Sequence, residues 1–285
     1  MKINKDIFQY IKEIDNSIYG LIKPYFLYHS NKLEGSTFSQ EELIKLVDNG
    51  KVIGDHDIDD VYETLNSIKV FDLIIDTLDE PLTPEFLKQV NSTLERNTRN
   101  DKLGLVGDYK KIPNRIRGCN IEVSMPKDVP AGINNLLEQW NKSEKQLEDI
   151  TVFHAKFEHI HPFQDGNGRT GRFIILKQCI ENDIDLVFID SNNNDTYKAW
   201  LEVAQTQQNC KYLTDLFKDS QACLEKEFEK NGILNNLNET IKCIKDIQEK
   251  KKEHIPNKDR GKGKQRVESK EEKPCKTAGR KDKIK

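Results

Sequence analysis

The sequence lacks any long hydrophobic run: nowhere do 18 or so apolar residues follow one another, which is about the length that a membrane-spanning helix needs. Its first residues, Met1–Asp6, lack the apolar core of a signal peptide. No pair of its cysteines has metal-ligand spacing; they are Cys119, Cys179, Cys210, Cys223, Cys243 and Cys275. These absences exclude a membrane span and predict a cytoplasmic chain with free, reduced thiols.

Charge is unevenly distributed along the chain. The net charge is −3, but residues 251–285 contain 14 Lys or Arg and 6 Asp or Glu, so this tail carries +8 and the first 250 residues carry −11. The tail is nearly free of apolar residues, which predicts disorder from about residue 251. Such a charge can bind nucleic acid or acidic protein. Because no aromatic side chains are interleaved to stack on bases, we favour a solubilising tail and expect no nucleic-acid partner.

The chain has no internal repeats and no alternation of strands and helices, which excludes a parallel α/β fold. Apolar residues instead recur at steps of three and four, as in helices with one buried face. Near the N-terminus, helices are predicted within 5–31, from Pro24 to Leu33 with Gly35 ending the helix, and after Ser39. Further helices are predicted over 57–77, from Pro84, over 129–141 and over 147–160. The last predicted helices begin after Gly168 and, twice, within 195–230. Residues 99–128 are broken by Gly and Pro and predict a loop with a small hairpin. We therefore expect an all-α domain over 1–230, followed over 231–285 by a helical extension and the basic tail.

One stretch, His161–Arg172, combines a histidine, a carboxylate, a Gly-Asn-Gly turn and two arginines. Gly166 and Gly168 predict a turn that exposes backbone N–H groups, and the helix that follows adds its positive end; both features bind anions. Arg169 and Arg172 lie three apart on that helix and can contact phosphate oxygens. The stretch therefore predicts a polyphosphate site.

Two further side chains of this stretch suggest chemistry. Asp165 beside a phosphate site makes sense as a ligand of Mg²⁺, which binds carboxylate and phosphate oxygens together. His161 titrates near neutral pH and can act as a general base on an incoming hydroxyl. A zinc site at His154, His159 and His161 is the alternative, but their spacing does not bring them to one helix face.

The same residues match, without a gap, the signature His-Pro-Phe-x-(Asp/Glu)-Gly-Asn-Gly-Arg-x-x-Arg, and on them the chain resembles the Fic family. Members of this family typically transfer AMP from ATP to a protein hydroxyl. The resemblance implies that His161 deprotonates the target and that Asp165 holds Mg²⁺. It also implies that the amides of Gly166–Gly168 and the Asn167 side chain cradle the phosphates, which Arg169 and Arg172 stabilise. The related Doc kinases carry Lys at the position of Gly168, so a glycine here favours AMP transfer.

A second motif, Ser30-x-x-x-Glu34-Gly35, resembles the family's inhibitory motif (Ser/Thr)-x-x-x-Glu-(Gly/Asn), on a helix expected over about 24–35. By resemblance, Glu34 pairs with Arg172 and removes an arginine that the γ-phosphate of ATP needs. The same glutamate can instead orient a water that removes AMP, as in some relatives. The alternative without a function is an ordinary helix end.

Other parts of the resemblance rest on single residues. The segment around Ile112 to Ile121 resembles the flap that docks the target chain, and Lys110 stands where many relatives have Arg. Tyr197 falls where the family often lines the adenine pocket, although it also suits the core of an amphipathic helix. Gln205 falls where some relatives have an Asn that contacts adenine.

The expected partners are therefore ATP, Mg²⁺ and a protein that offers a Ser, Thr or Tyr hydroxyl, which includes this chain itself. Three other functions stay open: an AMP-removing or bifunctional enzyme, a transferase of another nucleotide, and a nucleotide-binding regulator without turnover. A monomer and a homo-oligomer are both compatible with the sequence.

Overall fold

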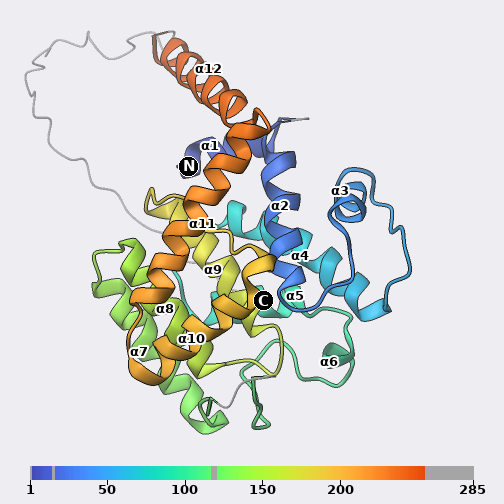
Figure 1. Ribbon diagram of the computed structural model, residues 1–285, viewed down its shortest axis with the longest axis vertical. Helices are drawn as coiled ribbons and strands as arrows, with labels where there is room; N and C mark the ends of the chain where they lie inside the picture. Colours follow the sequence, from blue (N-terminus) through green and yellow to red (C-terminus); the bar gives the residue numbers. More distant parts are fainter. Residues whose placement is uncertain (1, 15–16, 117–120, 254–285) are drawn as a thin grey trace, which may run out of the picture. The chain divides into compact units, whose positions relative to one another are not determined.

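The computed structural model describes residues 2–14, 17–116 and 121–253, and the described chain is built from helices and loops (Figure 1). The chain divides into two compact units, residues 1–244 and 245–285. The α-helices are α1 Lys5–Lys12, α2 Tyr19–Lys32, α3 Gln40–Asn49, α4 Ile58–Asp76, α5 Pro84–Leu94, α6 Arg99–Lys102, α7 Val129–Lys142, α8 Leu147–Ile160, α9 Asn167–Glu181, α10 Asn194–Gln207, α11 Lys211–Lys230 and α12 Ile233–Glu253. Short 3-10 turns, η1 Pro126–Asp128 and η2 Ser191–Asn193, precede α7 and α10. The predicted all-α fold is confirmed.

Local signals in the sequence set several helix starts as predicted. Ser39 accepts a hydrogen bond from the Glu42 amide, and the Glu42 side chain accepts one from Ser39, which forms a capping box at α3. At the start of α5, the Thr83 hydroxyl accepts a hydrogen bond from the Phe86 amide, and Pro84 occupies the first helical position. Such caps satisfy amides that have no partner inside the helix.

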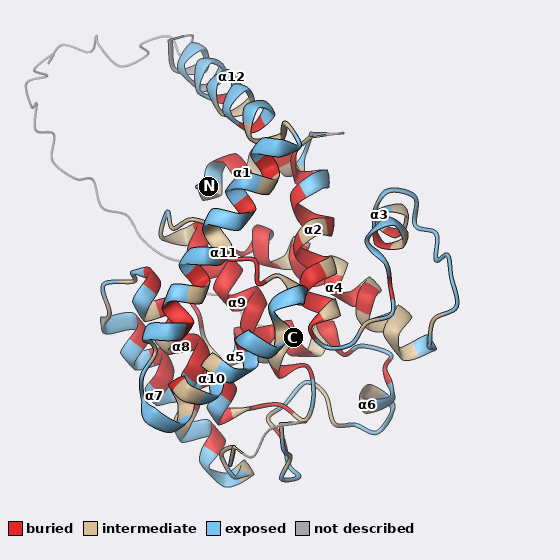
Figure 2. Cartoon of the chain, viewed as in Figure 1, coloured by how far each residue is buried: buried red, intermediate tan, exposed pale blue. Residues whose placement is uncertain are grey.

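Helix α9 forms the centre of the core (Figure 2), and almost all of its residues are buried. It packs against α2, α4, α5 and α8. A helix that is covered on several sides needs apolar residues all round, and the run Phe173–Leu176 provides them. The polar first turn of α9 is therefore held by a rigid core helix.

Helix α2 is attached to α4 by polar contacts. Lys23 and the Tyr19 hydroxyl both reach Asp72, at 2.7 Å and 2.5 Å. Near the C-terminal end of α2, the buried Ser67 hydroxyl of α4 donates to Asn31 Oδ1 at 3.0 Å. These bonds hold α2 on α4, and both helices also pack against α9 (Figure 1).

The predicted start of this helix at Pro24 is wrong, because α2 runs Tyr19–Lys32 with Pro24 inside it. An interior proline costs about 3 kcal/mol. Ile22, Phe26 and Leu27 are almost completely buried on the same helix, and each contributes about 1.5–3 kcal/mol by leaving water. Tertiary packing therefore outweighs the local preference.

The predicted stop of α2 at Gly35 is confirmed. The helix ends at Lys32, and Gly35 adopts a left-handed conformation with φ 95° while its amide donates to the Lys32 carbonyl. Glycine adopts this conformation without the steric cost that other residues have.

The segment after α5 differs in part from its prediction. The short helix α6 was not predicted, and the described residues 103–116 and 121–125 contain no strand. The centre of the predicted hairpin, residues 117–120, lies outside the described residues, so the flap stays a prediction.

Three remaining expectations concern membranes, thiols and the tail. Of the helices that the structure describes, none has the length and apolar content to cross a bilayer. Cys179, Cys210, Cys223 and Cys243 are free thiols, as predicted, while Cys119 and Cys275 lie outside the described residues. Helix α12 lies where a helical extension was predicted; the predicted disordered tail falls, after residue 253, outside the described residues.

Candidate active site

A short loop links α8 to α9 and carries the predicted motif. Helix α8 ends where expected, and His161 follows it in a left-handed conformation with φ 50° and ψ 61°. Asn167, in the first turn of α9, accepts a hydrogen bond from the Phe163 amide at 2.8 Å and donates one to the Phe163 carbonyl at 2.9 Å. Phe163 itself is fully buried. The side chain of Asn167 thus closes the loop around a buried aromatic anchor.

The two glycines of the motif have different roles. Gly166 has φ 73° and precedes α9, so it makes the turn that was predicted. Gly168 was expected to share in that turn, but it lies inside the first turn of α9 with an ordinary negative φ. A Cβ atom at Gly168 would collide with Glu34 Oε1 and lie 3.1 Å from Arg172 Nη1. Gly168 therefore leaves room for the Glu34 carboxylate and does not make the turn.

His161 lies in a partly enclosed position, with 15 % of its side chain exposed. Burial and, to a smaller extent, the nearby Lys110 ammonium together lower the pKa of His161 to about 4, against weaker opposite effects of Glu158, Glu34 and Asp165. Its Nδ1 atom lies 3.8 Å from Glu158 Oε2. His161 is therefore neutral at pH 7 and able to accept a proton.

Asp165 is held at the solvent-exposed side of the loop. Its Oδ1 accepts a bond from the Gly166 amide at 2.7 Å, and its Oδ2 accepts one from Asn100 at 3.0 Å. Asn91 donates to the Asp165 backbone carbonyl at 2.9 Å. These bonds orient the carboxylate and leave it open to solvent.

Arg169 points into a buried cluster of carboxylates. Its guanidinium contacts Glu63 at 2.5 Å and Glu95 at 3.0 Å. Glu95 is completely buried, and burial raises its pKa to about 7 against the opposite effect of Arg169. Neither glutamate was predicted as a site residue from the sequence. Glu95 follows Asn91 by one helical turn on the apolar face of α5, and this spacing indicates that its carboxyl is buried.

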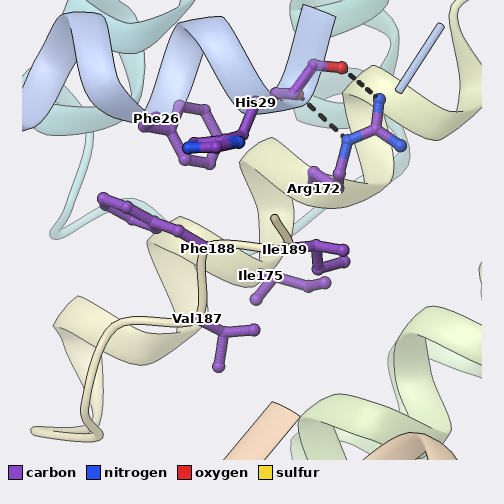
Figure 3. Close-up of a pocket in the computed structure, with 8 residues that line it drawn as sticks. Phe26, His29, Arg172, Ile175, Val187, Phe188 and Ile189 are labelled. Atoms are coloured by element: carbon purple, nitrogen blue, oxygen red, sulfur yellow. Dashed lines mark hydrogen bonds between the residues drawn. The ribbon is translucent and has the colours of Figure 1, made fainter. Parts of the chain in front are cut away.

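Arg172 reaches from α9 to α2 (Figure 3). Its Nε donates to the Ser30 hydroxyl at 3.0 Å, and its Nη2 donates to the Ser30 carbonyl at 2.9 Å and to Glu34 Oε1 at 2.7 Å. The predicted contact between Glu34 and Arg172, 138 positions apart, is thus present.

A small cavity of about 10 Å³ lies beside this contact and is lined by Phe26, His29, Arg172 and the segment Val187–Ile189 (Figure 3). It is barely large enough for one water molecule. The contact between α2 and α9 is therefore closely packed beside Arg172.

The two predicted adenine-contacting residues lie differently. Tyr197 is buried, and its hydroxyl lies 2.6 Å from His154 Nε2, under Arg172. Gln205 is partly exposed and donates to the Ala155 carbonyl on α8 at 3.3 Å. Tyr197 therefore joins the cluster around Arg172, whereas Gln205 contacts the backbone of the second half of α8.

Residues 81–179, which include the whole motif, match the family model described as Fic/DOC. The chain is 33 % identical over 100 residues to a probable protein adenylyltransferase from Aquifex aeolicus, covering 34 % of this chain and 30 % of that protein. It is 26 % identical over 199 residues to a protein adenylyltransferase Fic from Aedes aegypti, covering 62 % of this chain and 36 % of that protein. The chain thus spans about a third of the length of these curated relatives.

Solved structures show a similar fold. A Fic domain-containing signalling protein from Bacteroides thetaiotaomicron aligns with a TM-score of 0.63 over 80 % of this chain and 89 % of that chain, at 21 % identity. At this identity the similarity concerns the fold alone.

Proposed function

Because the chain belongs to the Fic/DOC family through its residues 81–179, we propose that it transfers AMP from ATP to a Ser, Thr or Tyr hydroxyl of a protein. We further propose that Glu34 keeps this activity low. The observation that carries the proposal is the contact of Ser30 and Glu34 with Arg172, at the end of the motif that begins with His161. The names of the relatives from Aquifex aeolicus and Aedes aegypti support the reaction type.

His161 is the proposed general base. The target hydroxyl oxygen attacks the α-phosphorus of ATP, its proton passes to the His161 imidazole, and the bond from the α-phosphorus to the bridging oxygen breaks to release pyrophosphate. The lowered pKa of His161 supports this role, because the imidazole is unprotonated at neutral pH before the reaction.

The start of α9 is the proposed phosphate site. Free amides at a helix start and the helix dipole attract anions, and Gly166 turns the chain into that helix. Arg172 supplies a guanidinium for the outer phosphates once Glu34 releases it. Arg169 is held by Glu63 and Glu95, so we propose that it stabilises the phosphates through its charge from a fixed position and not through a released guanidinium.

Asp165 fits the proposed Mg²⁺. Its carboxylate is exposed, and each oxygen has one hydrogen-bond partner and so retains a free lone pair. The described residues contain no group of three or more His, Cys, Asp or Glu side chains that could hold a metal alone. Mg²⁺ often binds through one carboxylate together with substrate phosphates, which suits this donor set. When bound, the ion neutralises phosphate charge.

Other assignments complete the proposal. Tyr197 and Gln205 border the adenine, Ile112–Ile121 docks the target, and the catalytic domain extends over 1–230 in the cytoplasm. The basic tail after residue 251 serves solubility.

The test uses the full chain with Glu34→Gly, incubated with ATP labelled either at the α-phosphorus or at the γ-phosphorus. We expect protein-bound label from α-labelled ATP alone, on the chain itself and on targets in a lysate, with a mass gain of one AMP. The matched control, Glu34→Gly with His161→Ala, should incorporate no label. Transfer of the γ-phosphate, or no transfer by the Glu34→Gly protein, would contradict the proposal.

Removal of AMP is a second candidate, which one observation favours. The side chain of Glu34 is 38 % exposed, so solvent water can reach its carboxylate while Arg172 orients it. The wild type should then remove AMP from a protein that the Glu34→Gly variant has modified, and the Glu34→Gln variant should not.

A further inference from the structure

Lys110 holds the backbone on both sides of His161. Its amide donates to the Pro162 carbonyl at 2.8 Å, and its Nζ donates to the Ile160 carbonyl at 3.4 Å. Its Nζ also donates to Asn114 Oδ1 at 2.9 Å. One residue from the loop after α6 therefore contacts the carbonyl before and the carbonyl after the histidine.

Asn114 extends this attachment along the motif loop. Its Nδ2 donates to the Phe163 carbonyl at 2.9 Å and to the Gln164 carbonyl at 3.4 Å. Lys110 and Asn114 together thus bind four carbonyls that flank or follow His161. From the sequence, Lys110 was known only as a lysine at a position where many relatives have arginine.

His161 needs such support because of its backbone conformation. A left-handed φ of 50° is unfavourable for any residue with a Cβ atom and persists only where the surroundings impose it. The Ile160 carbonyl belongs to the peptide group directly before His161, and the Pro162 carbonyl belongs to the second peptide group after it. The bonds from Lys110 therefore hold the backbone on both sides of His161, and with it the direction in which the imidazole leaves the backbone.

The charge of Lys110 also acts on His161. Lys110 is 3 % exposed and has no carboxylate partner within the described residues. Burial lowers the pKa of Lys110 to about 8, so most of it stays charged at pH 7. The charged and titratable groups that face His161 are Lys110 from the loop, Glu158 on α8, Glu34 in the turn after α2 and Asp165 in the motif loop, and Lys110 is the only cation among these four.

We propose that Lys110 is a positioning residue for His161, which fixes the orientation of the imidazole by holding the Ile160 and Pro162 carbonyls on either side of it and by placing a cation beside it. This inference rests on the proposed AMP transfer. It adds a residue outside the motif whose role is to prepare the base.

The test compares Lys110→Met, Lys110→Arg and Lys111→Met, all in the full chain with Glu34→Gly. Lys111 is exposed and adjacent, so Lys111→Met removes the same charge without touching the motif loop. The first readout is the imidazole resonance of His161 in NMR spectra between pH 7 and pH 5, assigned by its loss in His161→Ala. The second is the rate of AMP transfer, separated into kcat and KM.

We expect the His161 resonance to shift more over this range in Lys110→Met than in the parent or in Lys111→Met, because loss of the ammonium raises the pKa of the imidazole while its burial remains. The value of kcat should fall by about 10- to 100-fold in Lys110→Met, the usual effect of a misplaced catalytic group, with little change in the KM for ATP. Lys110→Arg should recover most of both properties. If Lys110→Met does not fold, Lys110→Gln replaces it, because it keeps a donor without the charge.

An unchanged His161 titration or an unchanged kcat in Lys110→Met would overturn the inference. The NMR readout needs no catalysis. If the parent fails to transfer AMP, the proposed function is wrong, and the titration still decides whether Lys110 controls His161.

Discussion

At the scale of single residues, the state of the site depends on which partner Arg172 has. Burial raises the pKa of Glu34, but Arg172 and Arg169 lower it more, so the net pKa lies below its ordinary value. Glu34 is therefore ionised at neutral pH, and its 2.7 Å contact with Arg172 is a charged hydrogen bond. An arginine bound in this way is not available to phosphate.

Replacing Glu34 should therefore activate the protein. We expect Glu34→Gly to raise AMP transfer by more than about tenfold, equivalent to about 1.4 kcal/mol, and Glu34→Gln to raise it less because the amide still contacts Arg172. The exposed Glu41→Gln is the control and should match the wild type. Equal rates of incorporation from labelled ATP in the wild type and in Glu34→Gly would contradict inhibition by this residue.

Arg169 should show a structural effect that is separate from catalysis. Arg169→Met leaves Glu95 buried without its cation, and the loss of one partner of a buried pair costs about 3–5 kcal/mol. The exposed Arg96→Met should change the free energy of unfolding by less than about 0.5 kcal/mol. Urea unfolding of both variants measures this difference. Equal stability of the two would mean that the cluster around Arg169 contributes nothing to folding.

At the scale of helices, the turn after α2 approaches the first turn of α9 at Gly168. A Cβ atom at Gly168 would collide with the Glu34 carboxylate, so Glu34 can keep its present position beside Arg172 only with glycine there. Alanine is otherwise preferred over glycine inside a helix by about 1 kcal/mol. The effect of an alanine at this position should therefore depend on Glu34.

A double-mutant cycle tests this dependence. We expect Gly168→Ala to destabilise the wild type but to be neutral or stabilising in the Glu34→Gly background, with a coupling energy of at least about 1 kcal/mol. Thermal or urea unfolding of the four proteins gives the coupling. Additive effects would show that α2 does not contact α9 at Gly168 in solution.

At the scale of the whole molecule, buried ionisable groups should make stability depend on pH. His154 is 1 % exposed, and burial together with Arg172 lowers its pKa to about 3. Between its ordinary value near 6.5 and about 3, the unfolded chain binds a proton that the folded chain does not, so the free energy of unfolding falls as the pH falls. Glu158 acts in the opposite direction, since burial raises its pKa to about 8.

Replacing His154 measures how much this residue contributes to the pH dependence of the free energy of unfolding. Because each pH unit in this window is worth about 1.4 kcal/mol, acidification from pH 7 to pH 5 should destabilise the wild type more than His154→Gln, which keeps a polar group near Tyr197. Urea unfolding at both pH values checks this. Parallel pH profiles of the two proteins would mean that His154 is protonated to the same extent in the folded and the unfolded chain.

Sequence reasoning predicted helices well where the signal is local. The bounds of α8 follow from its apolar spacing and from Pro162, and the start of α3 follows from Ser39 and Glu42. It failed at Pro24, where distant packing outweighs a local preference.

For the site, the motif indicated the chemical groups but not their supports. Glu63 and Lys110 come from segments far away in the sequence, and no local pattern marks a residue whose partner is fixed only by the fold. For Glu95, the position one helical turn after Asn91 predicted burial but not the contact with Arg169. Glu34 was an exception, because its resemblance to the inhibitory motif predicted the contact with Arg172.

The collision at Gly168 also has a consequence for evolutionary history. A lysine at this position, which marks the kinase branch in the resemblance described above, has a Cβ atom that the Glu34 carboxylate excludes. A lineage could acquire that lysine only once the Glu34 side chain was lost or had turned away from Gly168. Among descendants of this chain, loss of the contact between Glu34 and Arg172 should therefore accompany or precede any change of the transferred group.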